Sequence, residues 1–156
     1  MDHPNIEVCD TNHYGLALFA VASIGKDEVI VEFDGETYEA QRASLLPNDP
    51  PDYLQDHVIQ IGPTTYRASV GVGCYLSHSC DPNCGVKNKN QIVAMRDIGE
   101  GEELSFDYAM TENSDWTMKC ECGSPLCRGL MTGYRDLPTD FRLKYKGYIS
   151  SWLVEV

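Results

Sequence analysis

The feature that most constrains this chain is a cluster of cysteines near residue 120. Cys120, Cys122 and Cys127 form a C-x-C-x4-C array in a chain of 156 residues that has seven cysteines. The glycine, serine and proline between the second and third of them favour a turn that can bring the three thiols together. Zinc prefers tetrahedral sets of thiolates, and an odd cysteine count argues against a disulfide framework. The array therefore predicts three ligands of a zinc ion, with unligated thiols as the alternative.

The fourth ligand of such a site must come from elsewhere in the chain. Cys80 and Cys84, in the segment H-S-C-D-P-N-C, are the obvious donors, and spacing alone does not choose between them. Four thiolates around zinc leave no position open for a substrate. We therefore expect the metal to be structural and not catalytic.

The composition is that of an acidic globular domain. Hydrophobic residues make up 42% and charged residues 23% of the chain, which suits a single domain with its own core. The formal net charge of −12 repels phosphate groups, so direct nucleic-acid binding is disfavoured. The same charge would attract a basic protein or peptide, although it can also serve only to keep the protein in solution.

The sequence shows no sign of membrane targeting. No apolar run approaches the roughly 20 residues that a membrane-spanning helix needs. The first residues, M-D-H-P-N, lack the basic and apolar regions of a signal peptide. We therefore expect an intracellular protein without membrane association, in a reducing compartment where clustered thiols bind metal.

Short hydrophobic runs between turn residues predict a mostly-β chain. The runs expected to form strands are residues 15–21, 29–33, 58–61, 91–95 and 103–108. Residues 38–46 could hold a short helix. Near the end of the chain, Phe141, Tyr145, Ile149 and Trp152 recur at helical spacing, which predicts one amphipathic helix packed on the core.

Several motifs, in one order along the chain, resemble those of SET-domain protein-lysine methyltransferases. Residues 77–84 (S-H-S-C-D-P-N-C) resemble the family's N-H-S-C-x-P-N, and residues 103–108 (E-L-S-F-D-Y) resemble its E-L-x-F-D-Y. Residues 120–129 are similar to the post-SET motif C-x-C-x4-C-R-G, and residues 15–20 to G-x-G-[VL]-x-A. The resemblance covers most of the chain, from about residue 13 to residue 129.

The resemblance implies a fold that hydrophobic periodicity could not predict. SET domains consist of several small twisted β-sheets with a knot-like crossing, in which one strand threads under a loop. The two central motifs meet at that crossing and form the active site. The implied division is a SET domain over residues 1–118, a post-SET zinc-binding segment over 119–135 and a C-terminal helix over 136–156.

The resemblance also implies the chemistry. The reaction would be methyl transfer from S-adenosylmethionine to a lysine amine, with Tyr108 as the catalytic tyrosine that aligns the amine. Phe106 would line the substrate channel, at a position where phenylalanine is typical of enzymes that add two or three methyl groups. Cys80 would be the fourth zinc ligand, beside the C-x-C-x4-C array, and this structural Zn²⁺ would tie the post-SET loop over the active site.

The expected cofactor contacts come from two of the motifs. Tyr14, Gly15, Leu16, Ser77 and His78 are implied by the resemblance, and we expect His57 to border the same site. The chain departs from the family pattern at Ser77, where the usual residue is asparagine, and at Ala17, which replaces a glycine. The serine lacks an amide, so one hydrogen bond to the cofactor would be weaker or mediated by water, at a cost of about 1 kcal/mol.

These expectations define one main hypothesis and two alternatives. The main hypothesis is a lysine methyltransferase for a basic protein or peptide such as a histone tail, and we expect the enzyme to be nuclear in a eukaryote and cytoplasmic in a bacterium. The first alternative is a SET-domain binding module with a weakened active site, which the changes at Ser77 and Ala17 favour. The second is a methyltransferase for a non-histone protein.

Overall fold

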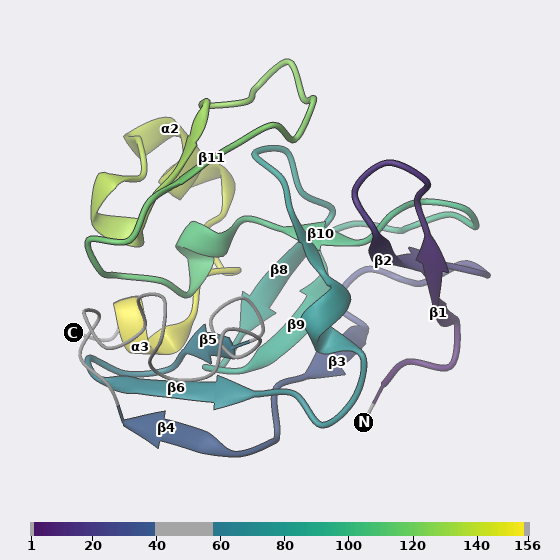
Figure 1. The fold of residues 1–156 in the computed structure, drawn as a ribbon, viewed down its shortest axis with the longest axis horizontal. Helices are drawn as coiled ribbons and strands as arrows, with labels where there is room; N and C mark the ends of the chain where they lie inside the picture. Colours follow the sequence, from purple (N-terminus) through teal and green to yellow (C-terminus); the bar gives the residue numbers. More distant parts are fainter. Residues whose placement is uncertain (1, 40–57, 155–156) are drawn as a thin grey trace.

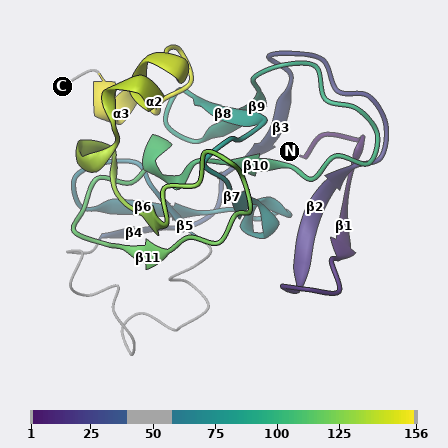
Figure 2. The same ribbon diagram turned by 90° about the horizontal axis from the view of Figure 1, so that it is seen from above.

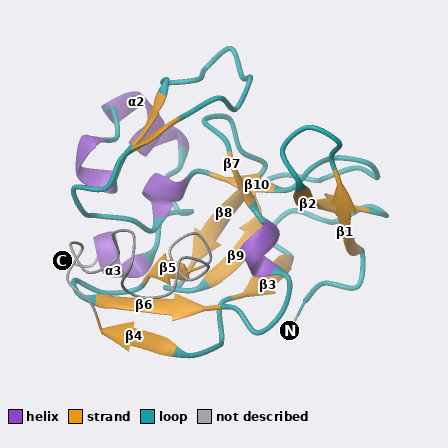
Figure 3. Cartoon of the chain, in the orientation of Figure 1, coloured by secondary structure: helices purple, strands orange, loops and turns teal. Residues whose placement is uncertain are grey.

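Short strands in small sheets make up most of the regular structure. The structure is a computed structural model that describes residues 2–39 and 58–154. Within these ranges the strands form three two-stranded and two three-stranded sheets, joined by loops and short helical turns (Figures 1 and 3). The strands are β1 (Ile6–Asp10), β2 (Leu16–Ala20), β3 (Val29–Glu32), β4 (Thr37–Glu39), β5 (Val58–Gln60), β6 (Thr65–Ala68), β7 (Ser77–His78), β8 (Cys84–Lys87), β9 (Gln91–Ala94), β10 (Ser105–Phe106), β11 (Met118–Lys119) and β12 (Leu130–Met131).

The central sheet has the order β3-β9-β8 and is antiparallel throughout. Its strands are rich in β-branched residues, which favour the extended conformation. Ile30, Val86 and Ile92 are fully buried, one from each strand. Consecutive apolar residues are buried along β9, so both faces of the sheet are covered. This sheet forms the hydrophobic core against which the other parts pack.

The β1–β2 hairpin lies at one end of the molecule, and the C-terminal helices lie at the other (Figures 1 and 2). Gly15 ends the hairpin loop with a φ of +94°, a conformation that favours glycine. Ala17, which replaces the family's second glycine, is fully buried within β2 and pairs with Cys9. Regular strand geometry accommodates this alanine.

A parallel pair of two-residue strands brings two distant motifs together. Ser77 pairs with Ser105, and His78 pairs with Phe106, in the β7–β10 ladder. Asn83 supports the pair, because its amide donates to the Glu103 carbonyl at 2.9 Å and accepts from the Ser105 amide at 3.0 Å. The H-S-C and F-D-Y motifs are therefore neighbours in space although about 25 residues separate them in sequence.

The prediction of one C-terminal helix over residues 136–156 is wrong. The segment forms a 3-10 turn (Tyr134–Asp136) and two short helices, α2 (Thr139–Lys144) and α3 (Ser151–Val154). Gly147 has a φ of +88°, which an α-helix does not allow and which interrupts the predicted helix. The apolar face still packs inward, with Tyr145 fully buried and Phe141, Ile149 and Trp152 half-buried.

The other predicted elements are confirmed in part. Strands occur in all five predicted runs, but β10 covers only Ser105–Phe106, because Tyr108–Met110 forms a 3-10 turn. The helix expected over residues 38–46 begins instead with strand β4, and its remainder lies outside the described residues, as does His57. None of the helices in the described ranges is long and apolar enough to cross a membrane.

The contact of Gly85 with Tyr148 predicts a packing effect. A Cβ atom on Gly85 would lie 2.5 Å from the Tyr148 Cβ, so Gly85→Ala should lower the free energy of unfolding by about 1–3 kcal/mol. Gly99→Ala is the matched control, because its Cβ would meet nothing closer than 3.6 Å from the Glu102 carboxylate. Urea denaturation measures both variants. Equal stability of the two would contradict the packing described here.

Candidate active site

Tyr108 lies in the wall of a cavity beside the β7–β10 pair. It opens the 3-10 turn that follows β10, and its hydroxyl donates to the Leu76 carbonyl at 2.8 Å. The cavity has a volume of about 560 Å³, within the range of roughly 300–1,000 Å³ that is common for ligand sites. A second, more open cavity of about 420 Å³ shares Leu76, Ser77 and Tyr108 with the first. Tyr108 therefore borders both spaces.

His78 fixes the start of the tyrosine turn. The Tyr108 backbone N–H donates to the His78 Nδ1 at 3.1 Å, so the ring proton lies on Nε2. The Nε2 is 3.5 Å from the Cys80 Sγ. Burial lowers the pKa of His78 to about 4, although the nearby Asp107 carboxylate opposes this. The imidazole is therefore neutral at pH 7, and its role is to position the backbone of the tyrosine.

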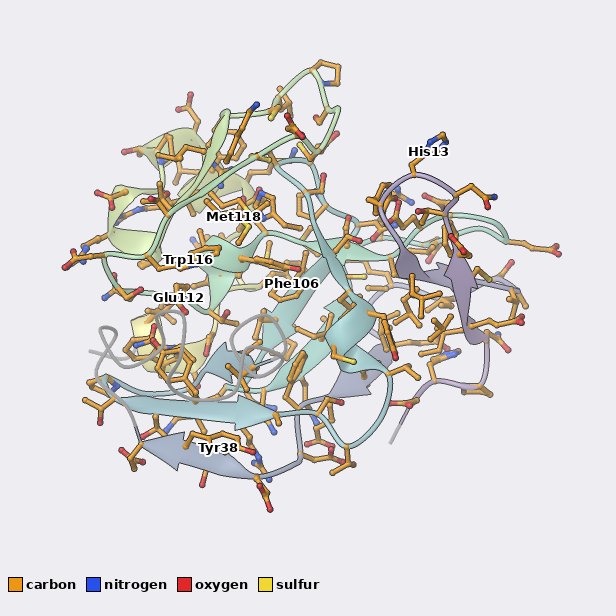
Figure 4. The ribbon with its side chains drawn as sticks, in the orientation of Figure 1. His13, Tyr38, Phe106, Glu112, Trp116 and Met118 are labelled. Atoms are coloured by element: carbon orange, nitrogen blue, oxygen red, sulfur yellow. The ribbon has the colours of Figure 1, made fainter. Side chains whose placement is uncertain are left out.

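Aromatic rings form the wall of the cavity around Tyr108. The Phe106 and Trp116 ring centroids lie 5.0 Å and 6.5 Å from that of Tyr108. Figure 4 labels Phe106 and Trp116, with Glu112 beside the tryptophan, and all three line the cavity. Phe106 was predicted from its motif. Trp116 was missed, because it follows a loop whose course the sequence does not indicate.

Asp107 is a fully buried carboxylate between the two predicted site residues of the F-D-Y motif. Arg128 pairs with it through two hydrogen bonds, of 2.7 Å and 3.0 Å. The Tyr145 hydroxyl donates to it at 2.8 Å and the Ala109 amide at 3.0 Å. Burial and the Asp107 carboxylate raise the pKa of Tyr145, so its hydroxyl stays protonated and continues to donate.

The Asp107 contacts join three segments of the chain. Arg128 follows the cysteine array, and its guanidinium also lies over the Phe141 ring at 4.6 Å. Tyr145 follows α2 and is fully buried. A bidentate pair between arginine and carboxylate fixes both position and orientation. The turn that carries Tyr108 is therefore held by the segment after the array and by the C-terminal segment together.

The four predicted zinc ligands converge. The Sγ atoms of Cys80, Cys120, Cys122 and Cys127 all lie within 4.8 Å of one another. Cys80 and Cys120 are 3.8 Å apart, close to the edge of about 3.8 Å expected for a tetrahedron with Zn–S bonds near 2.3 Å. Backbone amides of Arg128 and Gly129 donate to the sulfurs of Cys80 and Cys127 at 3.4 Å, an environment suited to thiolates.

Cys84, the other donor considered for the zinc site, lies apart from this cluster. It is fully buried in β8, and its thiol donates to the Asn83 Oδ1 at 3.4 Å. Burial raises the pKa of Cys84 to about 12, which keeps the thiol protonated. Cys84 is thus a core residue, and the geometry selects Cys80.

The residues predicted to contact the cofactor gather at one side of the cavities. Tyr14 and Ser77 line both cavities, His78 lines the larger and Leu16 the more open one. Tyr14 and Leu16 expose 61% and 51% of their surface, unusual for such large apolar groups, and this leaves them available to cover a ligand. Glu103 lines the same side and was not predicted, although it lies in a recognised motif.

Comparison with known protein families identifies this architecture. The family described as the SET domain matches residues 15–109, more than half of the chain. The chain belongs to the SET-domain family. The matched region includes β2, the β7–β10 pair and Tyr108, while β1, the cysteine array and the C-terminal segment lie outside it.

Curated relatives of this SET domain are histone-lysine N-methyltransferases. An H3 lysine-4 specific enzyme from Schizosaccharomyces pombe is 32% identical over 131 residues, which cover 74% of this chain and 14% of the relative. An H3 lysine-36 specific enzyme from the same organism is 32% identical over 142 residues, which cover 82% of this chain and 18% of the relative. The chain therefore spans less than a fifth of the length of either relative.

A solved structure shares the fold. The crystal structure of KRYPTONITE in complex with mCHG DNA and SAH superposes with a TM-score of 0.62. The match covers 81% of this chain and 29% of that chain at 19% sequence identity. The likeness shows that this SET domain has the same small-sheet fold.

The burial of Asp107 predicts a large stability difference between two arginine–carboxylate pairs. Asp107→Asn leaves the largely buried Arg128 without its counter-charge and should cost about 3–5 kcal/mol. Asp115→Asn breaks the pair with Arg135, in which the aspartate side chain is 95% exposed, and should cost less than about 1 kcal/mol. Denaturant unfolding compares the two. Similar small losses for both would show that the Asp107 network does not hold the site.

Proposed function

We propose that this SET domain is an S-adenosylmethionine-dependent protein-lysine N-methyltransferase. The observation that carries the proposal is the position of Tyr108, whose ring borders two adjoining cavities and whose hydroxyl is held at 2.8 Å from the Leu76 carbonyl. In-line transfer of a methyl group needs a donor and an acceptor that approach one point from opposite sides. Two adjoining spaces that share Tyr108 would give the donor and the acceptor each a place beside the phenol.

The aromatic wall would serve the amine of the substrate. A lysine amine is a nucleophile only when neutral, and enclosure by Phe106, Tyr108 and Trp116 would disfavour its charged form. The Tyr108 hydroxyl would orient the amine, and the neutral His78 imidazole holds the tyrosine backbone. S-adenosylmethionine would supply the methyl group, whose bond to sulfur breaks as the bond to the lysine nitrogen forms. We keep the expectation that Phe106 permits more than one methylation.

Two ligands are proposed for the remaining predicted residues. Tyr14, Leu16, Ser77 and His78 would hold the cofactor at the side of the cavities that they line, and Gly15, which lines neither cavity, would contribute from the hairpin loop between Tyr14 and Leu16. A structural zinc ion would bind Cys80, Cys120, Cys122 and Cys127, a proposal supported by the convergence of their four sulfurs within 4.8 Å of one another. The zinc would fix residues 119–135 beside the cavity, which Lys119, Cys122 and Met131 of this segment line.

The substrate class follows from charge and from the relatives. Glu112 lines the larger cavity beside Trp116, and the whole chain carries a net charge of −12. This field favours a basic protein segment such as a histone tail. The named relatives act on lysine-4 or lysine-36 of histone H3, so a nuclear histone substrate is our first candidate. A non-histone basic protein is the second.

Two expectations from the sequence, the weakened binding module and the absence of nucleic-acid binding, are revised. The weakened binding module is disfavoured, because the curated relatives are methyltransferases and because Tyr108 and the four cysteines are retained in this chain. The expectation against direct nucleic-acid binding rests on charge alone, since the structural relative was solved with DNA.

Replacement of Tyr108 tests the proposed function. Tyr108→Phe removes only the hydroxyl that would align the amine, so methyl transfer to a basic protein should fall by about 100-fold or more. Binding of S-adenosylhomocysteine should stay within about threefold. Tyr38→Phe, on β4 and outside both cavities, is the control that should keep its activity. Transfer of tritiated methyl groups measures both, and full activity of folded Tyr108→Phe would reject the assignment.

Loss of one thiolate tests the zinc site. Cys80→Ser should abolish the binding of about one equivalent of zinc and reduce methyl transfer, because the segment beside the cavity would lose its anchor. Cys9→Ser alters a cysteine in β1, away from the cluster, and should retain both zinc and activity. Metal analysis of the purified proteins decides the question. Retention of stoichiometric zinc by Cys80→Ser would contradict the ligand set.

A further inference from the structure

Glu103 is the centre of a hydrogen-bonded group at the side of the cavity where the cofactor is proposed to bind. The Ser77 hydroxyl donates to its Oε1 at 2.8 Å, and the Tyr14 hydroxyl donates to its Oε2. Ser77 lies in β7, Tyr14 in the β1–β2 loop and Glu103 just before β10. All three side chains line the larger cavity. The Glu103 carboxylate is therefore held at this cavity by side chains from two other segments of the chain.

The two hydroxyl groups leave the carboxylate able to bind a ligand. Each carboxylate oxygen has two lone pairs, and each receives one hydrogen bond from the residues that the structure describes. Partial burial, together with the hydrogen bond to Glu103, raises the pKa of Tyr14 to about 12, so the phenol stays a donor at pH 7. The carboxylate is thus fixed in orientation and keeps acceptor capacity on both oxygens.

No basic side chain in the described residues forms an ion pair with Glu103. Lys119 also lines the cavity, but its ammonium pairs with Glu121 at 2.9 Å. His78 also lines the cavity, but its Nδ1 accepts the Tyr108 backbone N–H and its Nε2 lies 3.5 Å from the Cys80 Sγ, so both ring nitrogens have other partners. A half-buried carboxylate of this kind is best compensated by a cationic group of the ligand.

We propose that Glu103 binds the ammonium group at the amino-acid end of the cofactor. The inference rests on the proposed function, since it assigns one end of the same ligand. The sulfonium of S-adenosylmethionine must meet Tyr108, where transfer occurs, and this leaves the ammonium as the cationic group for Glu103. Ser77, which lacks the side-chain amide of the usual asparagine, then contributes by orienting this carboxylate.

A purely structural role is the competing explanation. In that case Glu103 only fastens the β1–β2 loop to β7 through Tyr14 and Ser77. Its loss would disturb the shape of the cavity and weaken every ligand to the same degree. Direct binding of the ammonium predicts instead a loss confined to ligands that carry the amine.

A comparison of two ligands on the unaltered chain and two variants separates these roles. The probes are S-adenosylhomocysteine and its deaminated analogue, which keeps the adenosine, the sulfur and the carboxylate. Glu103→Gln should weaken S-adenosylhomocysteine about 10- to 100-fold, the range for a charged hydrogen bond, and should change the deaminated analogue by less than about threefold. Glu100→Gln, in an exposed turn outside the cavity, is the control and should change neither.

Calorimetry on the zinc-loaded full chain measures the six affinities, and thermal unfolding verifies that the variants are folded. Equal weakening of both ligands by Glu103→Gln would leave only the structural role, and no weakening of either would remove any role in binding. Failure of the unaltered chain to bind S-adenosylhomocysteine would overturn the proposed function itself, an outcome distinct from both.

Discussion

The buried carboxylate of Asp107 is the contact on which the rest of the site depends. It receives four hydrogen bonds, two from Arg128 and one each from Tyr145 and Ala109. These donors come from the segment after the cysteine array, from the C-terminal segment and from the turn that carries Tyr108. A buried charge in a low dielectric is tolerated only when it is fully paired, so the three segments must assemble together. The site is therefore a product of tertiary structure and not of any one motif.

The β7–β10 pair extends this arrangement toward the ligands. It sets His78 beside Phe106, and the imidazole then accepts the backbone N–H of Tyr108. Ser77 of β7 donates a hydrogen bond to Glu103, which lies just before β10, and the Tyr14 hydroxyl donates to the same carboxylate. One short ladder thus carries residues for both halves of the proposed reaction: the aromatic wall for the amine and the polar group for the cofactor.

Much of this site could be predicted from the sequence, because motif residues keep their spacing. Cys80 and the cysteine array were named and converge in one cluster, and Phe106 and Tyr108 line one cavity, while the roles of these residues stay predictions. The choice between Cys80 and Cys84 was not available from spacing alone, since both lie in one short segment and only the fold shows that the Cys84 side chain belongs to the core. His57 lies outside the described residues, so its place stays a prediction.

The features that were missed depend on tertiary contacts or on single backbone angles. The apolar periodicity of Phe141, Tyr145 and Trp152 indicated the buried face, but the positive φ of Gly147 divides the helix, which periodicity cannot reveal. Trp116 reaches the cavity from a loop, and Glu103 becomes part of the site only through side chains from two other segments. Two-residue strands such as β7 and β11 are too short to have a hydrophobic pattern of their own.

If these motifs form one pocket for a sulfonium cofactor, the chain must bind S-adenosylmethionine. The most direct measurement is a calorimetric titration of S-adenosylmethionine into the zinc-loaded, folded chain, with and without a basic histone-like peptide. We expect saturable binding of one cofactor per chain. A complete absence of binding heat at several temperatures, with folding verified and the peptide present, would contradict it.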